Sequence, residues 1–214
     1  MKLNYWGHQT LKQLENASLD TYQSDELKLT IMQHGIMVNQ YFLDLYSHIQ
    51  FNTPLQYTWV IPEWLYDNKE YILKNLLPIG TLSSYQIYHD IGKPFCKTYD
   101  IESKKPHFYN HAEISATVYP GSEEIKELIG SDMLIHTIKA KDIEWFSERE
   151  DAMSLLLTGL SEIHANAEMF GGIESTSFKI KYKQINQRGK ALLKRLVSWL
   201  LKNGEKQIVV TTQH

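Results

Sequence analysis

Cysteine is almost absent from this sequence, and that absence limits the chemistry available to the chain. The 214 residues include one Cys, six Pro and 11 Gly. A single Cys excludes a disulfide framework and any Cys-rich zinc site, and it fits a reducing compartment. Any metal bound here must therefore be held by His and carboxylate side chains, and the sequence has nine His.

Long apolar runs are also missing. No stretch approaches the roughly 18 apolar residues of a membrane span, and the N-terminal segment lacks the apolar core of a signal peptide. We therefore expect a cytoplasmic protein with no membrane contact. The composition, 43% hydrophobic and 22% charged, is that of a folded globular chain. No linker or repeat is visible, so residues 1–214 are predicted to form a single all-α domain.

The net charge of −3 conceals an uneven distribution. Residues 179–214 carry nine Lys and Arg against Glu205 alone, a net of +8, whereas residues 1–178 carry a net of −11. A basic segment on an acidic body can bind phosphates. We therefore consider residues 177–214 a candidate nucleic-acid contact and Lys179 a candidate substrate contact. The alternative interpretation is a solvated helix face.

Apolar spacing and capping residues predict a mostly helical chain. Residues 51–60 and 95–110 are expected to be loops, and residues 207–212 are β-prone without an identifiable partner strand. Helices are predicted over about 25–48, 63–77, 82–91, 111–118, 123–130, 133–140, 147–170 and 177–202.

The histidines are concentrated in the predicted helices, and one of them is followed directly by an acid. In the string IYHDIGKPF, His89 and Asp90 place an imidazole and a carboxylate at the C-terminal end of a helix, where both can reach one ion. Lys93 adds a cation beside them. Such ligands suit Mn, Fe, Co, Ni, Zn or Mg, and the nearby cation suits a phosphate bridged to the metal.

The string HDIGKP, with the run FYNHAEISA at 108–116 and MLIH at 133–136, resembles the HD superfamily of metal-dependent phosphohydrolases. The similarity is to the HD domains attached to bacterial CCA-adding enzymes, and it covers about residues 30–170. It implies an HD-type helical bundle with its core over about 25–172 and one or two divalent metals inside. The metal ligands that it implies are His34, His89, Asp90, His111 and His136.

The last ligand of this family is usually an Asp on the final core helix. The matching stretch here, LLLTGLSEIHANAE at 155–168, has His164 at the expected place. We therefore expect His164 to be a ligand, which would favour a late divalent ion over Mg²⁺. Glu162 or Glu168 could serve instead, or the site lacks this ligand.

The resemblance implies hydrolysis of nucleotide or RNA-end phosphoesters, either phosphomonoesters or 2′,3′-cyclic phosphodiesters, by a metal-activated water. Asp90, Lys93, His111 and His136 are the expected catalytic residues, and the last three would also contact the substrate phosphate. Two alternatives are an HD-fold diiron oxygenase and a nucleotide-binding HD module without catalysis.

Overall fold

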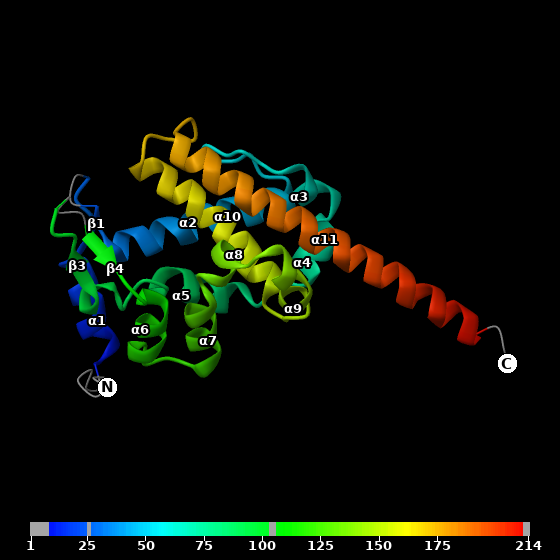
Figure 1. Cartoon of the computed structure of the whole chain (residues 1–214), viewed down its shortest axis with the longest axis horizontal. Coiled ribbons are helices and arrows are strands. Elements are labelled where there is room, and N and C mark those ends of the chain that lie inside the picture. The colour runs from blue at the N-terminus through cyan, green and yellow to red at the C-terminus, as the bar shows by residue number, and fades with distance from the viewer. Residues whose placement is uncertain (1–8, 25–26, 103–105, 212–214) are drawn as a thin grey trace.

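The computed structural model describes residues 9–24, 27–102 and 106–211, with side chains up to residue 196, and it is mostly helical as expected (Figure 1). In chain order the elements are α1 (Leu11–Leu19), β1 (Tyr22–Ser24), β2 (Leu29–Thr30), α2 (Ile31–Phe51), α3 (Glu63–Asp67), α4 (Lys69–Lys74), α5 (Ile79–Tyr88), η1 (Lys93–Phe95), β3 (Lys97–Tyr99), β4 (Pro106–Phe108), α6 (His111–Val118), α7 (Glu123–Ser131), α8 (Leu134–Thr137), η2 (Ala140–Asp142), α9 (Ile143–Ser147), α10 (Ala152–Met169) and α11 (Thr176–Thr211).

Helices α2 and α10 form the centre of the molecule. They pack against each other, while α5 covers α2 and α11 covers α10. Every residue of α10 is buried except Glu162 and Glu168. The two carboxylates are therefore the least buried side chains of this helix. One continuous apolar core runs from Leu14 in α1 to Leu193 in α11. Burial of the apolar side chains in this core is the main force that holds the helices together.

Close contact between α2 and α5 depends on Gly35. A Cβ atom at this position would lie 2.2 Å from the backbone carbonyl oxygen of Ile87. Because no side-chain rotation can move a backbone oxygen, only glycine allows the two helices to approach this closely. Gly35 follows His34 on α2, and Ile87 precedes His89 by two residues, so this contact brings the two histidines together.

The turn after α5 is held against α6 in a similar way. The Gly92 N–H donates to Ser115 Oγ at 2.9 Å, and a Cβ atom on Gly92 would lie 2.4 Å from the Ser115 backbone nitrogen. Helix α6 begins at His111, as predicted. The contact therefore places the first residue of α6 near Asp90.

The structure corrects several predicted boundaries. Helix α2 starts at Ile31 because Thr30 caps it, accepting from the Gln33 N–H at 3.2 Å; residues 25–26, the predicted start, lie outside the described residues. The expected loop at 95–110 contains the antiparallel pair β3–β4. The predicted helix over 63–77 is two short helices, α3 and α4, and α9 was not predicted.

The C-terminal helix is longer than predicted. Helix α11 passes the expected stop at residues 203–204 and continues to Thr211, so the β-prone residues up to that point are helical. Figure 1 shows its C-terminal part, drawn in red, extending beyond the other helices. Within the described residues, no helix is long and apolar enough to cross a membrane.

Candidate metal centre

Three side chains predicted as metal ligands meet in the interior. His34 from α2, and His89 and Asp90 from the turn after α5, each have at most 2% of their surface exposed. His89 Nε2 lies 3.3 Å and His34 Nε2 3.7 Å from Asp90 Oδ2. One ligand atom from each residue lies within 4.8 Å of the others. These residues form a buried group that could hold a metal ion, and we call it the His/Asp cluster.

Several polar atoms of the His/Asp cluster lack hydrogen-bond partners. Both ring nitrogens of His34, Nε2 of His89 and Oδ1 of Asp90 are buried and unpaired. Leaving a buried donor or acceptor unpaired costs about 1–3 kcal/mol for each group. Such a concentration of unpaired atoms is unfavourable for a merely structural cluster, and a bound ion would satisfy one ligand atom of each of the three residues.

The spacing of these atoms fits a shared ion. Two ligand atoms that are each about 2.1 Å from a metal lie about 3.0 Å apart at right angles and about 4.2 Å apart when opposite. The measured 3.3 Å and 3.7 Å separations fall inside that range. The His89 Nδ1–H donates to the Gln86 carbonyl at 2.7 Å, which directs Nε2 toward the cluster.

Burial and neighbouring charges shift the pKa values of all three residues of the His/Asp cluster. Burial alone would raise the pKa of Asp90, but His89 and Lys93 hold it well below its usual range. Burial likewise opposes protonation of His89, yet Asp90 and Asp132 raise its pKa to about 10. Burial lowers the pKa of His34 to about 3, which leaves that imidazole neutral and ready to bind a metal.

Lys93 and His111 also contact Asp90. The Lys93 ammonium donates to Asp90 Oδ2, and it also donates to Gln23 of β1 at 3.1 Å. His111 Nε2 lies 3.6 Å from Asp90 Oδ1, and its Nδ1 contacts the Phe108 carbonyl at 3.0 Å. The two carboxylate oxygens of Asp90 therefore face different histidines.

The structure separates His136 from Asp90 and pairs it with an acid on α10. His136 Nε2 lies 2.9 Å from Glu162 Oε2. Burial raises the pKa of Glu162, but His136, His89 and His34 outweigh this effect and lower it. Among the described residues, Glu162 contacts the imidazole of His136, while the charges of His34 and His89 also act on its pKa.

Asp132 was not anticipated as part of this region. Its side chain is buried, with Oδ1 accepting from the Tyr85 hydroxyl at 2.6 Å and Oδ2 unpaired. Burial raises its pKa, and the charges of His89 and His136 oppose that change. The available signal in the sequence is an acid four residues before His136.

His164 lies outside the His/Asp cluster. Its Nε2 accepts from the Val60 N–H at 3.0 Å, and its Nδ1–H donates to the Leu160 carbonyl at 2.8 Å. The ring packs on Trp59 and Phe178, with centroid distances of 4.3 Å and 5.0 Å. Because both nitrogens are bonded to the backbone, neither is free for a metal in this structure.

The remaining candidates are also apart from the cluster. Glu168, an alternative to His164, accepts from the Tyr41 hydroxyl at 2.5 Å. Lys179 is exposed near the start of α11 and forms an ion pair with Glu174 at 2.7 Å. The structure therefore places Lys179 on the surface.

The comparisons with known proteins found no counterpart: no family model, no curated protein and no solved structure matches the chain. The site itself is thus the basis for any functional conclusion. It defines a mostly helical protein with a buried His/His/Asp group of metal-binding type.

A substitution of His164 should affect stability without affecting metal content. His164→Ala leaves a cavity beside Trp59 and removes the acceptor of the Val60 N–H, so we expect a loss of about 2–4 kcal/mol in the free energy of unfolding. Urea denaturation measures that loss, and elemental analysis of the folded variant should give the wild-type metal content. Metal loss with unchanged stability would instead make His164 a ligand.

The same residue should make stability depend on pH. Burial lowers the pKa of His164 to about 4 from 6.5, so the unfolded chain binds a proton more readily than the folded one. As pH falls from about 6.5 to about 4, His164 should cost up to about 3 kcal/mol of stability. The stability advantage of the wild type over His164→Gln should therefore shrink over this range. An advantage that stays constant between pH 7.5 and 4.5 would contradict the assignment.

Proposed function

We propose that this chain is a metal-dependent phosphohydrolase of the HD type that acts on phosphoesters of nucleotides or RNA ends. The observation that carries the proposal is the buried His34, His89 and Asp90 group with its unpaired ligand atoms. The order of these residues along the chain, followed by His111 and His136, supports an HD-type bundle.

The residues around the cluster suit a phosphoester. A divalent ion held by His34, His89 and Asp90 would supply Lewis acidity and a water of lowered pKa. Lys93 and His111 face Asp90 and are less buried than the three ligands, since their side chains are 9% and 19% exposed. These groups offset negative charge that develops on the phosphate oxygens.

His136 and Glu162 form a second acid–imidazole pair in this region. The His136 and Glu162 side chains are 18% and 16% exposed, so both are partly accessible. His136 is proposed as a substrate contact, and Glu162 orients its ring through the 2.9 Å hydrogen bond. We therefore propose Glu162, rather than His164, as the functional residue that α10 contributes to this region.

A nucleotide or RNA end is favoured over other phosphoesters by two features. The motifs are most similar to those of HD domains that act on such substrates, and α11 carries exposed basic residues near its start, Lys179, Lys181 and Lys183. A cationic surface raises the local concentration of polyanions.

The test is a metal and substrate screen of the purified full chain. Elemental analysis should find a divalent metal, and nucleoside monophosphates or 2′,3′-cyclic phosphates should be hydrolysed with at least one of Mn²⁺, Ni²⁺, Co²⁺ and Mg²⁺. Absence of hydrolysis with every metal, together with nucleotide binding, would favour a non-catalytic module and contradict the proposal.

One observation keeps the diiron oxygenase as a second candidate. Because Glu162 pairs with His136 at 2.9 Å, this region has one carboxylate more than it would have with His164 as the ligand, and iron sites that activate oxygen use such ligands. Oxygen consumption by the iron-loaded protein, without phosphate release, would favour this candidate.

A further inference from the structure

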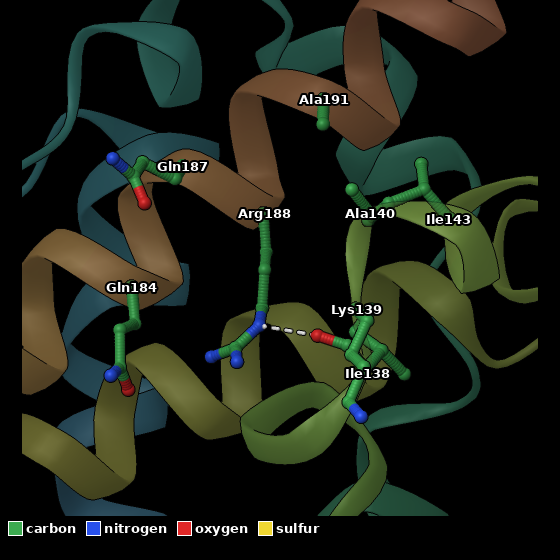
Figure 2. Close-up of a pocket in the computed structure, with 8 residues that line it drawn as sticks. All are labelled: Ile138, Lys139, Ala140, Ile143, Gln184, Gln187, Arg188 and Ala191. Carbon is green, nitrogen blue, oxygen red and sulfur yellow. Dashed lines mark hydrogen bonds between the residues drawn. The ribbon is translucent and has the colours of Figure 1, made fainter.

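A pocket of about 320 Å³ lies between α11 and the segment from Ile138 to Ile143 (Figure 2). Its wall contains none of the residues of the His/Asp cluster, although Ile138 follows His136 by two residues. The residues that line it are Ile138, Lys139, Ala140, Ile143, Gln184, Gln187, Arg188 and Ala191.

Arg188 is the notable member of this wall. Figure 2 shows its side chain reaching from α11 to the backbone of Ile138, where Nε donates to the carbonyl oxygen at 3.1 Å. Its Nη1 is buried without a hydrogen-bond partner, and burial lowers the pKa of the guanidinium. A partly desolvated cation of this kind is unfavourable unless an anion accompanies it.

Other arginines of the chain are neutralised within the described residues. Arg149 donates to both carboxylate oxygens of Asp151, at 2.7 Å and 2.6 Å, and Arg195 pairs with Glu144. By contrast, none of the residues that line the pocket is Asp or Glu. The pocket wall therefore contains a guanidinium and no acid, and a guanidinium is a cation that suits a carboxylate or phosphate.

The rest of the wall indicates the shape of the ligand. Ile138, Ile143 and the two alanines provide an apolar surface, Gln184 and Gln187 provide amides, and Lys139 adds a second positive charge. A volume of about 320 Å³ is at the small end of ligand sites, which are roughly 300–1,000 Å³. An apolar body of modest size fits such a wall.

We propose that this pocket binds a small organic oxyanion, a carboxylate or a phosphorus oxyanion attached to an apolar or aromatic body, with the oxyanion on Arg188. The proposal is independent of hydrolysis at the His/Asp cluster. Benzoate and phenylphosphonate represent the two sources of the oxyanion, and benzyl alcohol is their neutral counterpart; none of the three contains a phosphoester.

Isothermal titration calorimetry of the full chain as purified tests the proposal. At least one of the two oxyanions should bind, and about tenfold or more tightly than benzyl alcohol; their relative affinities distinguish carboxylate from phosphorus oxyanion. Equal binding of the neutral probe, or no binding of either oxyanion, would overturn the proposal.

Three variants locate the binding. Arg188→Met should weaken oxyanion binding about tenfold or more, and Ala191→Phe should do the same by filling the pocket while Arg188 and its bond to Ile138 remain. Lys74→Met, an exposed lysine on α4 outside the pocket wall and outside the basic segment, should leave the affinity unchanged. Equal loss in Lys74→Met, or unaltered binding in Ala191→Phe, would overturn the assignment to this pocket. Binding should persist in Asp90→Asn, which separates the pocket from the proposed hydrolase site.

Discussion

Asp90→Asn should abolish metal-dependent phosphoester hydrolysis, lowering the rate by about 10³-fold or more. Asp90 contacts both histidines of the His/Asp cluster and two residues beside it: His34, His89 and Lys93 lie near Oδ2, and His111 lies near Oδ1. An amide in its place removes the negative charge that holds a cation and leaves Lys93 without its acidic partner. Metal content and phosphate release should therefore be lost together.

The matched control is Asp44, a half-buried carboxylate on α2, the helix that carries His34. Asp44 on α2 accepts from the Gln56 and Tyr57 N–H groups and from the Trp59 indole, and no imidazole pairs with it among the described residues. Asp44→Asn should lower stability by about 1–2 kcal/mol while metal content and activity per folded molecule stay near wild type. Circular dichroism of both variants establishes that they are folded. Full hydrolysis by folded, metal-free Asp90→Asn would contradict the assigned role.

Gly35→Ala should destabilise the protein by about 2–4 kcal/mol and weaken metal binding at the same time. The added methyl group would lie 2.2 Å from the Ile87 carbonyl oxygen, well inside van der Waals contact. Helices α2 and α5 must therefore move apart, which separates His34 from His89 and Asp90. Thermal unfolding with and without added metal measures both effects, because a ligand that binds the folded state raises its stability.

Gly80→Ala provides the control for this change. Gly80 lies in α5, the partner of α2, and a Cβ atom there would meet nothing within 4 Å. Since alanine favours a helix over glycine, this variant should be neutral or more stable by up to about 1 kcal/mol. If Gly35→Ala and Gly80→Ala had the same stability and the same metal response, the close helix contact would not be what positions the site.

The helices near the site could be predicted from the sequence because apolar spacing and capping residues within a short segment determine them. The run from His111 to Val118 is helical with the predicted ends, and the helix predicted over 82–91 is present as α5 at Ile79–Tyr88, so His89 and Asp90 lie just after its end. The β3–β4 hairpin was missed because its strands are three residues each, too short for an alternating pattern to show.

The choice between Glu162 and His164 could not be made from sequence. Residues two apart on a helix point about 200° away from each other, so only one of the pair faces the His/Asp cluster. Which one does so depends on how α10 packs against α2 and α11, a tertiary property. The buried Asp132 and the chain of hydrogen bonds from Asn39 through Gln86 to Thr158, at 2.8 Å and 2.9 Å, likewise depend on that packing.

Crystals of the full chain grown with Mn²⁺ and measured with anomalous scattering would show whether His34, His89 and Asp90 hold a divalent metal. We expect an anomalous peak in bonding contact with all three side chains and with no atom of His164, and Lys93 displaced from Asp90 or sharing it. A fully occupied metal elsewhere, or an unchanged Lys93–Asp90 pair with no peak between the histidines, would contradict this expectation.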